Sequence, residues 1–343
     1  MLIRPKALVL GGGVAGASAA INLSQRDVDV TLVERDAVLG GNARTVCCKA
    51  VDGECQFCGG CLLADTMRDL DSVERLHTLT RTSVVRARRA DGGFYVETAP
   101  GNGEAFYDAV ILATGFAPID ARTRGSYGYG VLPMVTTGEE MERRLRQEGQ
   151  HAYDDLPLER VAFIQCVGSR DEHAGRGYCS QVCCRYAVRL ARLLKAQRPD
   201  SEITLFKMDI QVAGRDFAPA RAEGIRMVAG LPAVIRRAED DPTRAEFLYD
   251  DILESAPRRE TFDLVVLSVG MRPRDDAAAV AGMFGLHRNI DGFYATTDDG
   301  VSTLVPGLFV AGACGAPRAI AESIVHAQQA AETCHRYLLG RAP

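Results

Sequence analysis

Four cysteines with the spacing of a metal site interrupt what otherwise reads as a nucleotide-binding pattern. They are Cys166, Cys179, Cys183 and Cys184, in the arrangement C-x12-C-x3-C-C. Thiolates ligate iron–sulfur clusters, and a [4Fe–4S] cube takes four of them. Cys179 and Cys183 are four residues apart, so they share one face of an expected helix, and Cys166 at the end of a strand can close the site. Zinc also accepts four cysteines, and a disulfide or inert buried thiols are the remaining alternatives.

The position of Cys166 is informative because two stretches of the chain align with each other at a constant offset of 155 residues. Lys6–Gly13 aligns with Val161–Gly168, and Asp108–Pro118 aligns with Asp263–Pro273. We interpret the two halves as copies of one nucleotide-binding design. In the second copy, Cys166 replaces the first glycine of the phosphate loop.

The second copy also contains an insertion. Ile203–Asp209 matches Val30–Asp36 only at an offset of 173, so 18 residues are added (173 minus 155), and they bring the later cysteines. Lys207 stands where the first copy has Glu34. Without a glycine turn or the acid, this half is expected to bind no NAD(P)H, although a lysine there is compatible with a 2′-phosphate.

The first copy keeps the complete dinucleotide fingerprint, Gly11-x-Gly13-x-x-Gly16. These glycines permit a tight turn, close approach of the backbone to a pyrophosphate, and packing of helix on strand. A helix over Val14–Ser24 directs its positive N-terminus at the phosphates. Glu34 ends the next strand, where a carboxylate accepts the ribose hydroxyls of the adenosine half.

Three further segments favour FAD over NAD in the first half. Gly40-Gly41, Ala113-Thr114-Gly115 and Gly307–Ala313 resemble segments of flavoprotein oxidoreductases with two dinucleotide-binding domains. That superfamily usually has an acid where Ala313 stands. A helix from Ala319 to about Leu338 would point its N-terminus at the flavin and stabilise negative charge on the reduced ring. Arg318 either adds a fixed positive charge there or is a solvated arginine at a helix start.

Composition excludes several classes. The 343 residues suffice for two domains, 47% of them are hydrophobic, and the net charge of −5 with a pI of about 5.8 gives no basic field for nucleic acid. No apolar run reaches the roughly 20 residues of a membrane helix. The small apolar run Ala7–Ala20 superficially resembles a secretory signal, but a buried strand, glycine turn and helix explain it. Nine of the eleven cysteines crowd into two segments, which suits a reducing, cytoplasmic compartment.

The residues around the four cysteines resemble one family specifically. Gln165–Asp171, Tyr178–Cys184, Met208-Asp209-Ile210 and Gly312–Ile320 are similar to the flavin-containing A-type subunits of heterodisulfide reductases. The resemblance covers nearly the whole chain but only the central module of that family. No C-x2-C-x2-C-x3-C-P run occurs, so the resemblance does not extend to the family's ferredoxin-like domain, and electron bifurcation is not expected to follow from it. Short forms of this kind resemble proteins of bacterial sulfur-oxidation complexes.

The resemblance implies an α/β fold with two Rossmann-like domains, of the type found in thioredoxin and disulfide reductases. The FAD-binding domain would comprise residues 1–120 and 275–343, and residues 121–274 would form an inserted domain that carries the cluster. Within the inserted domain, the residues predict a helix at Glu139–Gln147 between loop-rich connections. The implied cofactors are FAD and one [4Fe–4S] cluster on Cys166, Cys179, Cys183 and Cys184. The residues implied to contact FAD are Gly11, Gly13, Val14, Ala15, Gly16, Glu34, Arg35, Gly40, Gly41, Val84, Ala113, Thr114, Gly115, Gly312, Ala313, Arg318 and Ile320.

A second group of cysteines leaves three alternatives open. Cys47, Cys48, Cys55, Cys58 and Cys61 follow the Gly40-Gly41 pair. They could hold a second cluster, form a redox dithiol although the C-x4-C spacing of disulfide reductases is missing, or be structural. Two isolated thiols, Cys314 and Cys334, are expected to be packed in the core. The six histidines show no ligand spacing.

The leading expectation is an oxidoreductase subunit that converts two-electron flavin chemistry into one-electron cluster transfer. No nucleophile or acid–base pair is evident, so substrate chemistry is assigned to partners, which by resemblance are heterodisulfide reductase B- and C-like subunits. The resemblance also implies a homodimer. The alternatives are a self-sufficient FAD thiol–disulfide oxidoreductase using Cys47–Cys61, and an FAD-containing scaffold without redox function.

Overall fold

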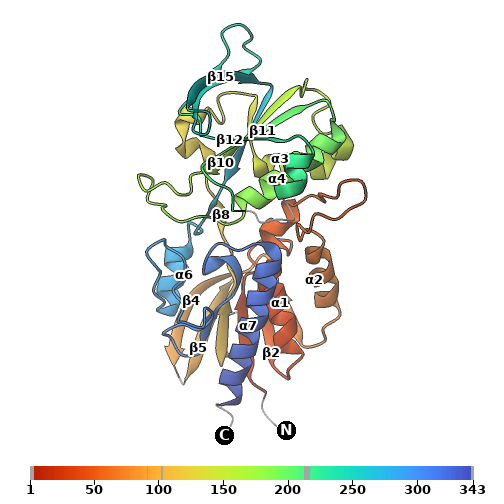
Figure 1. Cartoon of the computed structure of the whole chain (residues 1–343). Coiled ribbons are helices and arrows are strands. Elements are labelled where there is room, and N and C mark those ends of the chain that lie inside the picture. The colour runs from red at the N-terminus through yellow and green to blue at the C-terminus, as the bar shows by residue number, and fades with distance from the viewer. Residues whose placement is uncertain (1–3, 91, 102, 212–216, 341–343) are drawn as a thin grey trace. The chain divides into compact units, whose positions relative to one another are not determined.

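The computed structural model describes residues 4–90, 92–101, 103–211 and 217–340, and these fold into two compact units. Unit 1 contains Met1–Arg44, Gly59–Ala117 and Arg272–Pro343, and unit 2 contains Thr45–Cys58 and Pro118–Met271. Each unit has a five-stranded parallel sheet and a three-stranded antiparallel sheet (Figure 1). Both units therefore have the Rossmann-like α/β architecture that the sequence predicts.

The parallel sheet of unit 1 has the strand order β18-β7-β1-β2-β3. Its strands are β1 (Lys6–Leu10), β2 (Asp29–Val33), β3 (Leu76–Leu79), β7 (Ala109–Leu112) and β18 (Leu308–Val310). The antiparallel sheet consists of β4 (Ser83–Ala90), β5 (Gly93–Ala99) and β6 (Gly103–Tyr107). The helices are α1 (Val14–Ser24), α2 (Leu62–Asp71), α6 (Ala277–Phe284) and α7 (Ile320–Leu339).

Both faces of this sheet are buried, which explains why its strands are almost entirely apolar. Ala7 and Val9 of β1 pack in a cluster with residues of α1 and α7. Leu8, which points to the opposite face, packs in a cluster with Phe94 of β5 and Phe284 of α6. The helices and the antiparallel sheet thus cover opposite faces and hold the carboxyl ends of the strands in one fixed row.

Unit 2 repeats this plan with the strand order β12-β11-β10-β16-β9. The strands are β9 (Val135–Thr137), β10 (Arg160–Val167), β11 (Glu202–Lys207), β12 (Arg226–Ala229) and β16 (Leu264–Val269). The antiparallel sheet consists of β13 (Ile235–Arg237), β14 (Ala245–Asp251) and β15 (Ala256–Phe262). The helices are α3 (Gly138–Glu148), α4 (Cys183–Gln197) and α5 (Phe217–Ala222). Two short strands, β8 (Ala117–Pro118) and β17 (Met271–Arg272), stand at two of the four places where the chain passes between the units.

The internal repeat predicted from the sequence is visible in the pairing of the strands. In unit 1, β1 lies between β2 and β7, and in unit 2, β10 lies between β11 and β16, with every pair parallel. Ala109 and Leu264, which begin β7 and β16, are separated by the predicted offset of 155. The register of β10 differs by one residue: Val161 pairs with Leu264 as Ala7 pairs with Ala109, an offset of 154 (161 minus 7), and a register shift follows between Ile164 and Val167. Cys166 lies within this shift at the carboxyl end of the second sheet, next to the place of Gly11 in the first.

Local sequence signals predict where the helices begin and end. The predicted helix Val14–Ser24 has those bounds in the structure, and the helix predicted at residues 139–147 runs from Gly138 to Glu148. Its start is fixed by a capping box, in which the Thr137 hydroxyl accepts the Glu140 N–H and the Glu140 carboxylate accepts the Thr137 N–H.

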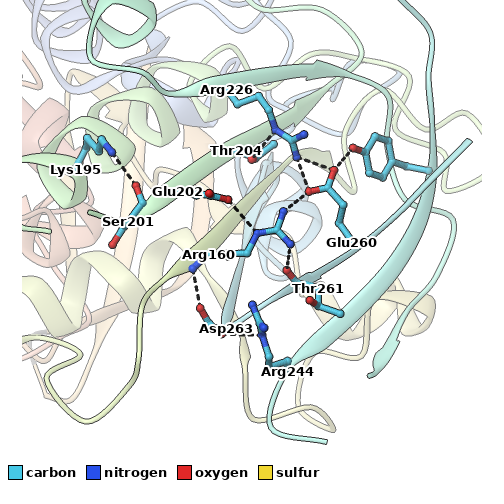
Figure 2. Close-up of polar contacts among 11 residues, drawn as sticks. Arg160, Lys195, Ser201, Glu202, Thr204, Arg226, Arg244, Glu260, Thr261 and Asp263 are labelled. Carbon is cyan, nitrogen blue, oxygen red and sulfur yellow. Dashed lines mark hydrogen bonds and ion pairs between the residues drawn. The ribbon is translucent and has the colours of Figure 1, made fainter. Parts of the chain in front are cut away.

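The amino edge of the second sheet is held by a network of charged side chains (Figure 2). Arg160, which begins β10, donates its N–H to Asp263 at 2.6 Å and its guanidinium to Glu260 and to Glu202. Arg226, which begins β12, pairs with Glu260 at 2.7 Å. These contacts satisfy charges at the edge opposite the cysteines, so the two edges of this sheet have different roles.

The division into units differs from the expected domains in one segment. Thr45–Cys58 belongs to unit 2, whereas the sequence places it in the FAD-binding domain. A separate property concerns membranes: none of the helices in the described part of the chain combines the length and apolar character needed to cross a bilayer.

Candidate flavin and thiol sites

The phosphate loop of unit 1 is too tightly packed to accept side chains at two of its glycines. Gly11 has φ +109°, and a Cβ placed on it would lie 2.4 Å from the Ala113 carbonyl oxygen. A Cβ on Gly16 would lie 1.8 Å from the Gly11 carbonyl oxygen. Both positions therefore require glycine for the turn and for packing α1 against the sheet.

Gly13 has a different environment. A Cβ built on this residue would meet no protein atom within 4 Å. Gly13 is also the N-cap of α1, and no side chain caps that end of the helix. The first backbone N–H groups of α1 therefore face open space, which is the geometry that binds a pyrophosphate.

Glu34 is held beside this loop by backbone hydrogen bonds. One carboxylate oxygen accepts the Gly12 N–H at 2.7 Å and the other accepts the Asp36 N–H at 2.8 Å. Each carboxylate oxygen has a further lone pair, so hydrogen bonds from ribose hydroxyls remain available. The Gly40 N–H donates to the Gly12 carbonyl at 2.8 Å, which brings the predicted Gly40-Gly41 pair to the same loop.

Two of the expected FAD contacts lie in other settings. Arg35 forms an ion pair with Asp276 at 2.5 Å, on the surface of unit 1. Val84 lies on β4 and is partly buried against the cluster under that sheet. Neither residue has a contact that by itself indicates a ligand.

The C-terminal segment packs directly against the start of α1. A Cβ on Gly312 would lie 2.5 Å from Ala15 Cβ. Residues almost 300 positions apart in the chain thus meet at the expected FAD site. The Arg318 guanidinium donates to the Gly312 carbonyl at 2.9 Å and to the Ala316 carbonyl at 3.2 Å. Arg318 is therefore tied to this segment and is not a freely solvated side chain.

His326 is a site residue that the sequence did not reveal. Its Nδ1 accepts the Gly312 N–H at 2.9 Å, and its Nε2 lies 2.8 Å from the Gly300 carbonyl, to which it donates. Burial, with the positive charge of Arg318, lowers the pKa of His326 and keeps the ring neutral. The only available signal was a lone histidine on the inner face of the expected C-terminal helix.

Cys166 adopts the backbone conformation that its alignment with Gly11 implies. It has φ +59°, and a register shift separates Ile164 from Val167 in the pairing of β10 with β16. A non-glycine residue in the left-handed region typically costs about 1–3 kcal/mol, and such residues concentrate at functional sites. The turn of the nucleotide loop is thus retained, with a thiol added.

Cys183 and Cys184 begin α4 and lie beside Cys166. Hydrogen bonds to Cys166 and Cys184, together with burial, raise the pKa of Cys183. The hydrogen bond between Cys183 and Cys184 lowers the pKa of Cys184 to about 7. Hydrogen bonding by Cys183, and then the Arg170 guanidinium, lower the pKa of Cys166. Three of the four predicted ligands therefore form one buried group.

The inserted segment positions the fourth cysteine. Residues Asp171 and Arg176 form an antiparallel bridge, and the buried Ser180 hydroxyl lies 2.6 Å from the Ser169 hydroxyl and accepts the Met271 N–H at 2.8 Å. Cys179, next to Ser180, accepts the Gln181 N–H at its Sγ (3.3 Å).

Within the described ranges, no three or more His, Cys, Asp or Glu side chains are positioned to hold a metal ion. The chemistry of the site nevertheless fits a thiolate-bound group. Three thiols adjoin one another, and the buried Gln165, which precedes Cys166 in the chain, has no hydrogen-bond partner at either side-chain atom among the residues that the structure describes. Buried amides normally have partners, so an unsatisfied one marks a place where a polar group is missing.

The first group of cysteines is divided between the units. Cys47, Cys48, Cys55 and Cys58 belong to unit 2, and Cys61 belongs to unit 1. Cys47 is buried, and burial raises its pKa to about 11, whereas Cys48, Cys55 and Cys61 are exposed. A buried thiol with a raised pKa is a poor redox nucleophile, which disfavours the dithiol hypothesis.

The isolated thiols Cys314 and Cys334 are both buried, as expected. Cys314 donates to the Leu112 and Ala311 carbonyls at 3.3 and 3.2 Å. Burial raises the pKa of both thiols, so they are packed core residues.

Comparison with known proteins identifies relatives of the sequence. The chain is 30% identical to an A-type iron–sulfur subunit of CoB–CoM heterodisulfide reductase from Methanopyrus kandleri, over 96% of this chain and 64% of that protein. It is 28% identical to the A-type subunit of the ferredoxin:CoB–CoM heterodisulfide reductase of Methanosarcina mazei, over 92% of this chain and 51% of that protein. The chain thus spans about half to two thirds of the length of these relatives. The predicted resemblance to the A-type subunits of heterodisulfide reductases is confirmed.

Solved structures with the same fold include disulfide reductases. Thioredoxin reductase of T. acidophilum has a TM-score of 0.64 at 16% identity, covering 96% of this chain and 97% of that chain. The NAD-dependent persulfide reductase from A. fulgidus has a TM-score of 0.60 at 18% identity, covering 96% and 59%. At these identities the likeness concerns the fold alone.

The sequence model of the pyridine nucleotide-disulphide oxidoreductases matches residues 5–332. That range includes the phosphate loop, Glu34 and the closing segment at Gly312, so the model and the geometry of unit 1 agree on a flavin site. The chain therefore belongs to the pyridine nucleotide-disulphide oxidoreductase family, a family of flavin-dependent oxidoreductases.

Proposed function

We propose that this protein is an FAD- and [4Fe–4S]-containing electron-transfer subunit of a heterodisulfide reductase-like complex that acts in sulfur metabolism. The observation that carries the proposal is the replacement of the second phosphate loop by Cys166, with Cys183 and Cys184 buried beside it. A domain that had only lost its nucleotide would have no need of three adjoining thiols at that edge.

Unit 1 supplies the residues that would hold FAD. The N–H groups at the start of α1 would receive the pyrophosphate, and Glu34 would accept the ribose hydroxyls. The contacts proposed for the flavin end come from Ala113-Thr114-Gly115, Gly312-Ala313, Arg318 and Ile320. Arg318 would place a fixed positive charge there because its guanidinium is tied to the Gly312 carbonyl.

Unit 2 supplies four thiolates from Cys166, Cys179, Cys183 and Cys184. When both groups are bound, a flavin exchanges electrons in pairs and an iron–sulfur cluster exchanges them singly, so the protein would connect the two kinds of chemistry. The 18-residue insertion would serve to bring Cys179 to the site.

The partners we propose are heterodisulfide reductase B- and C-like subunits, because the relatives are named as subunits of such complexes. We further propose a homodimer, a cytoplasmic location, and a short form related to bacterial sulfur oxidation, without use of NAD(P)H. The proposed domain boundaries are those of the two units, with Thr45–Cys58 assigned to the second.

The test is the ratio of iron and acid-labile sulfide to flavin in anaerobically purified protein. About four irons per FAD are expected, and about eight would add a cluster at the first group of cysteines. Cys183→Ser should lose the iron and retain FAD, while the matched control Cys334→Ala, another buried thiol, should retain both. Protein without iron, or iron that persists in Cys183→Ser, would refute the proposal; zinc in place of iron would identify a structural metal site.

A further inference from the structure

Gln165 is a buried polar side chain that directly precedes Cys166 in the chain. None of the contacts described so far explains why a polar residue stands there. Gln165 is 1% exposed, and neither its Nε2 nor its Oε1 has a hydrogen-bond partner among the described residues. Leaving a buried amide unsatisfied costs about 1–3 kcal/mol per polar group. A hydrophobic residue, as found at the four positions Val161–Ile164 of the same strand, would avoid this cost.

Strand β10 brings Gln165 to the carboxyl edge of the sheet. Val161 and Phe163 pack in one cluster with residues of α4, whereas Ala162 and Ile164 pack in the cluster on the opposite face. This alternation ends at the register shift between Ile164 and Val167, and Val167 packs in the same cluster as Ile164. Gln165 lies within the shift, directly before Cys166 in the chain.

The start of α4 lies over the same end of the sheet. Tyr186, in the first turn of this helix, donates its hydroxyl to the Val269 carbonyl at the end of β16, at 2.9 Å. Cys183 and Cys184 begin the helix, and the Cys183 thiol is hydrogen-bonded to Cys166. Gln165 therefore lies buried at the sheet edge at which the thiols gather.

We propose that the Gln165 side-chain amide donates a hydrogen bond from Nε2 to a sulfur of the cluster held by Cys166, Cys179, Cys183 and Cys184, and thereby raises its reduction potential. A donor to sulfur stabilises the more negative, reduced state, and hydrogen bonds to the sulfurs are among the factors that set cluster potentials. Gln165 is a positioning residue, not a ligand. The inference rests on the proposed cluster.

The experiment is a redox titration of the purified protein with dithionite, following the electron paramagnetic resonance signal of the reduced cluster. Gln165→Met removes the donor and keeps an unbranched side chain of similar volume. The matched control is Ile164→Met, which places the same side chain at the neighbouring buried position without removing a polar group. Iron content and circular dichroism are measured for each variant.

We expect wild type and both variants to hold about four irons per FAD. The one-electron reduction of Gln165→Met should be about tenfold less favourable, a midpoint shift of about −59 mV, while Ile164→Met stays at the wild-type value. A fully loaded Gln165→Met variant with the wild-type midpoint would overturn the inference and leave the proposed function intact.

Two other results have a defined meaning. If Gln165→Met folds but lacks iron while Ile164→Met retains it, Gln165→His, which restores an N–H donor, decides: return of the iron supports the inference, and continued loss overturns it. If the wild-type protein already lacks iron, the proposed function fails first, and this inference fails with it.

Discussion

Single residues explain how one fold came to have two different sites. Gly11 and Cys166 align in sequence at the offset of 155, and both have positive φ. On the proposed function, a thiol at this point of the second loop would take the place of a phosphate and would supply a cluster ligand. By contrast, the surroundings of Cys47 disfavour its thiolate form, because burial raises the pKa of this thiol to about 11.

The reactivity of Cys47 toward an alkylating reagent should differ from that of its neighbours. The thiolate is the reactive form, so a rise from 9 to about 11 lowers its population near pH 8 about 100-fold, and burial lowers access further. In native protein at pH 8, iodoacetamide should label Cys48 and Cys55 and spare Cys47, as judged by peptide mass spectrometry. Labelling of Cys47 should rise steeply only above about pH 10.

The pH dependence of the folding stability follows from the same rise in the pKa of Cys47. The pKa of Cys47 is higher in the folded protein, so the unfolded chain releases this proton first, and stability declines as the pH rises from about 9 toward 11. Cys334 serves as the internal control, because it is fully buried and should remain unlabelled until the protein is denatured. Equal labelling of Cys47 and Cys48 at pH 8 would revive the dithiol hypothesis.

At the scale of secondary-structure elements, the connection from β1 to α1 determines the FAD site. The loop is compact where helix and strand touch, at Gly11 and Gly16, and open where the helix N-terminus faces outward, at Gly13. The same connection in unit 2, from β10 to α4, is lengthened by the inserted segment. The proposed exchange of a nucleotide for a cluster would therefore need a change in one connection and none in the order of the strands.

Two alanine substitutions test this description of the loop. Gly13→Ala finds open space in the protein and should change the stability of the FAD-free form by less than about 1 kcal/mol. The methyl group would enter the pyrophosphate site, so FAD affinity should fall at least about tenfold, measured by quenching of flavin fluorescence.

Gly16→Ala is the contrasting variant. Its Cβ would lie 1.8 Å from the Gly11 carbonyl oxygen, so the backbone must shift and the FAD-free protein itself should lose more than about 2 kcal/mol. Urea titration of both FAD-free variants makes the comparison. Undiminished FAD affinity in Gly13→Ala would place the pyrophosphate elsewhere.

At the scale of the whole molecule, the chain contributes a short segment of its first third to unit 2. Within Thr45–Cys58, Lys49 is 2% exposed and pairs with Glu142 of α3 at 2.7 Å. The same carboxylate accepts the Cys47 N–H at 3.2 Å. Gln56 of this segment donates to the Arg189 carbonyl of α4 at 3.1 Å. Buried polar contacts thus attach the segment to two helices.

Removal of one partner of this buried pair should be strongly destabilising. Lys49→Met leaves the Glu142 carboxylate buried without its cation, at a cost of about 3–5 kcal/mol. The double variant Lys49→Met/Glu142→Leu should recover much of that loss. Arg143→Ala, which breaks the exposed Arg143–Glu139 pair at 2.8 Å on the same helix, should cost less than about 0.5 kcal/mol.

Urea unfolding of the three variants measures these differences. Comparable losses in Lys49→Met and Arg143→Ala would show that the Lys49 contact contributes no more than a surface pair, and the attachment of Thr45–Cys58 would need another explanation.

The sequence by itself determined the features that depend on local spacing. The glycine fingerprint, the α1 bounds Val14–Ser24 and the position of α3 follow from patterns within short windows, and the repeat became visible because two such windows match each other. They were predictable because a tight turn, a helix cap or a buried parallel strand restricts the residue types at each position.

Only the tertiary structure decided the features that depend on contacts between distant residues. The partner of Lys49 lies 93 positions away, the partner of His326 at Gly300 lies 26 away, and Ala15 meets Gly312 across most of the chain. No local pattern encodes such pairings, because they arise when whole sheets and helices pack. The burial of Cys47, the locked ring of His326 and the unsatisfied amide of Gln165 therefore became visible only in the folded protein.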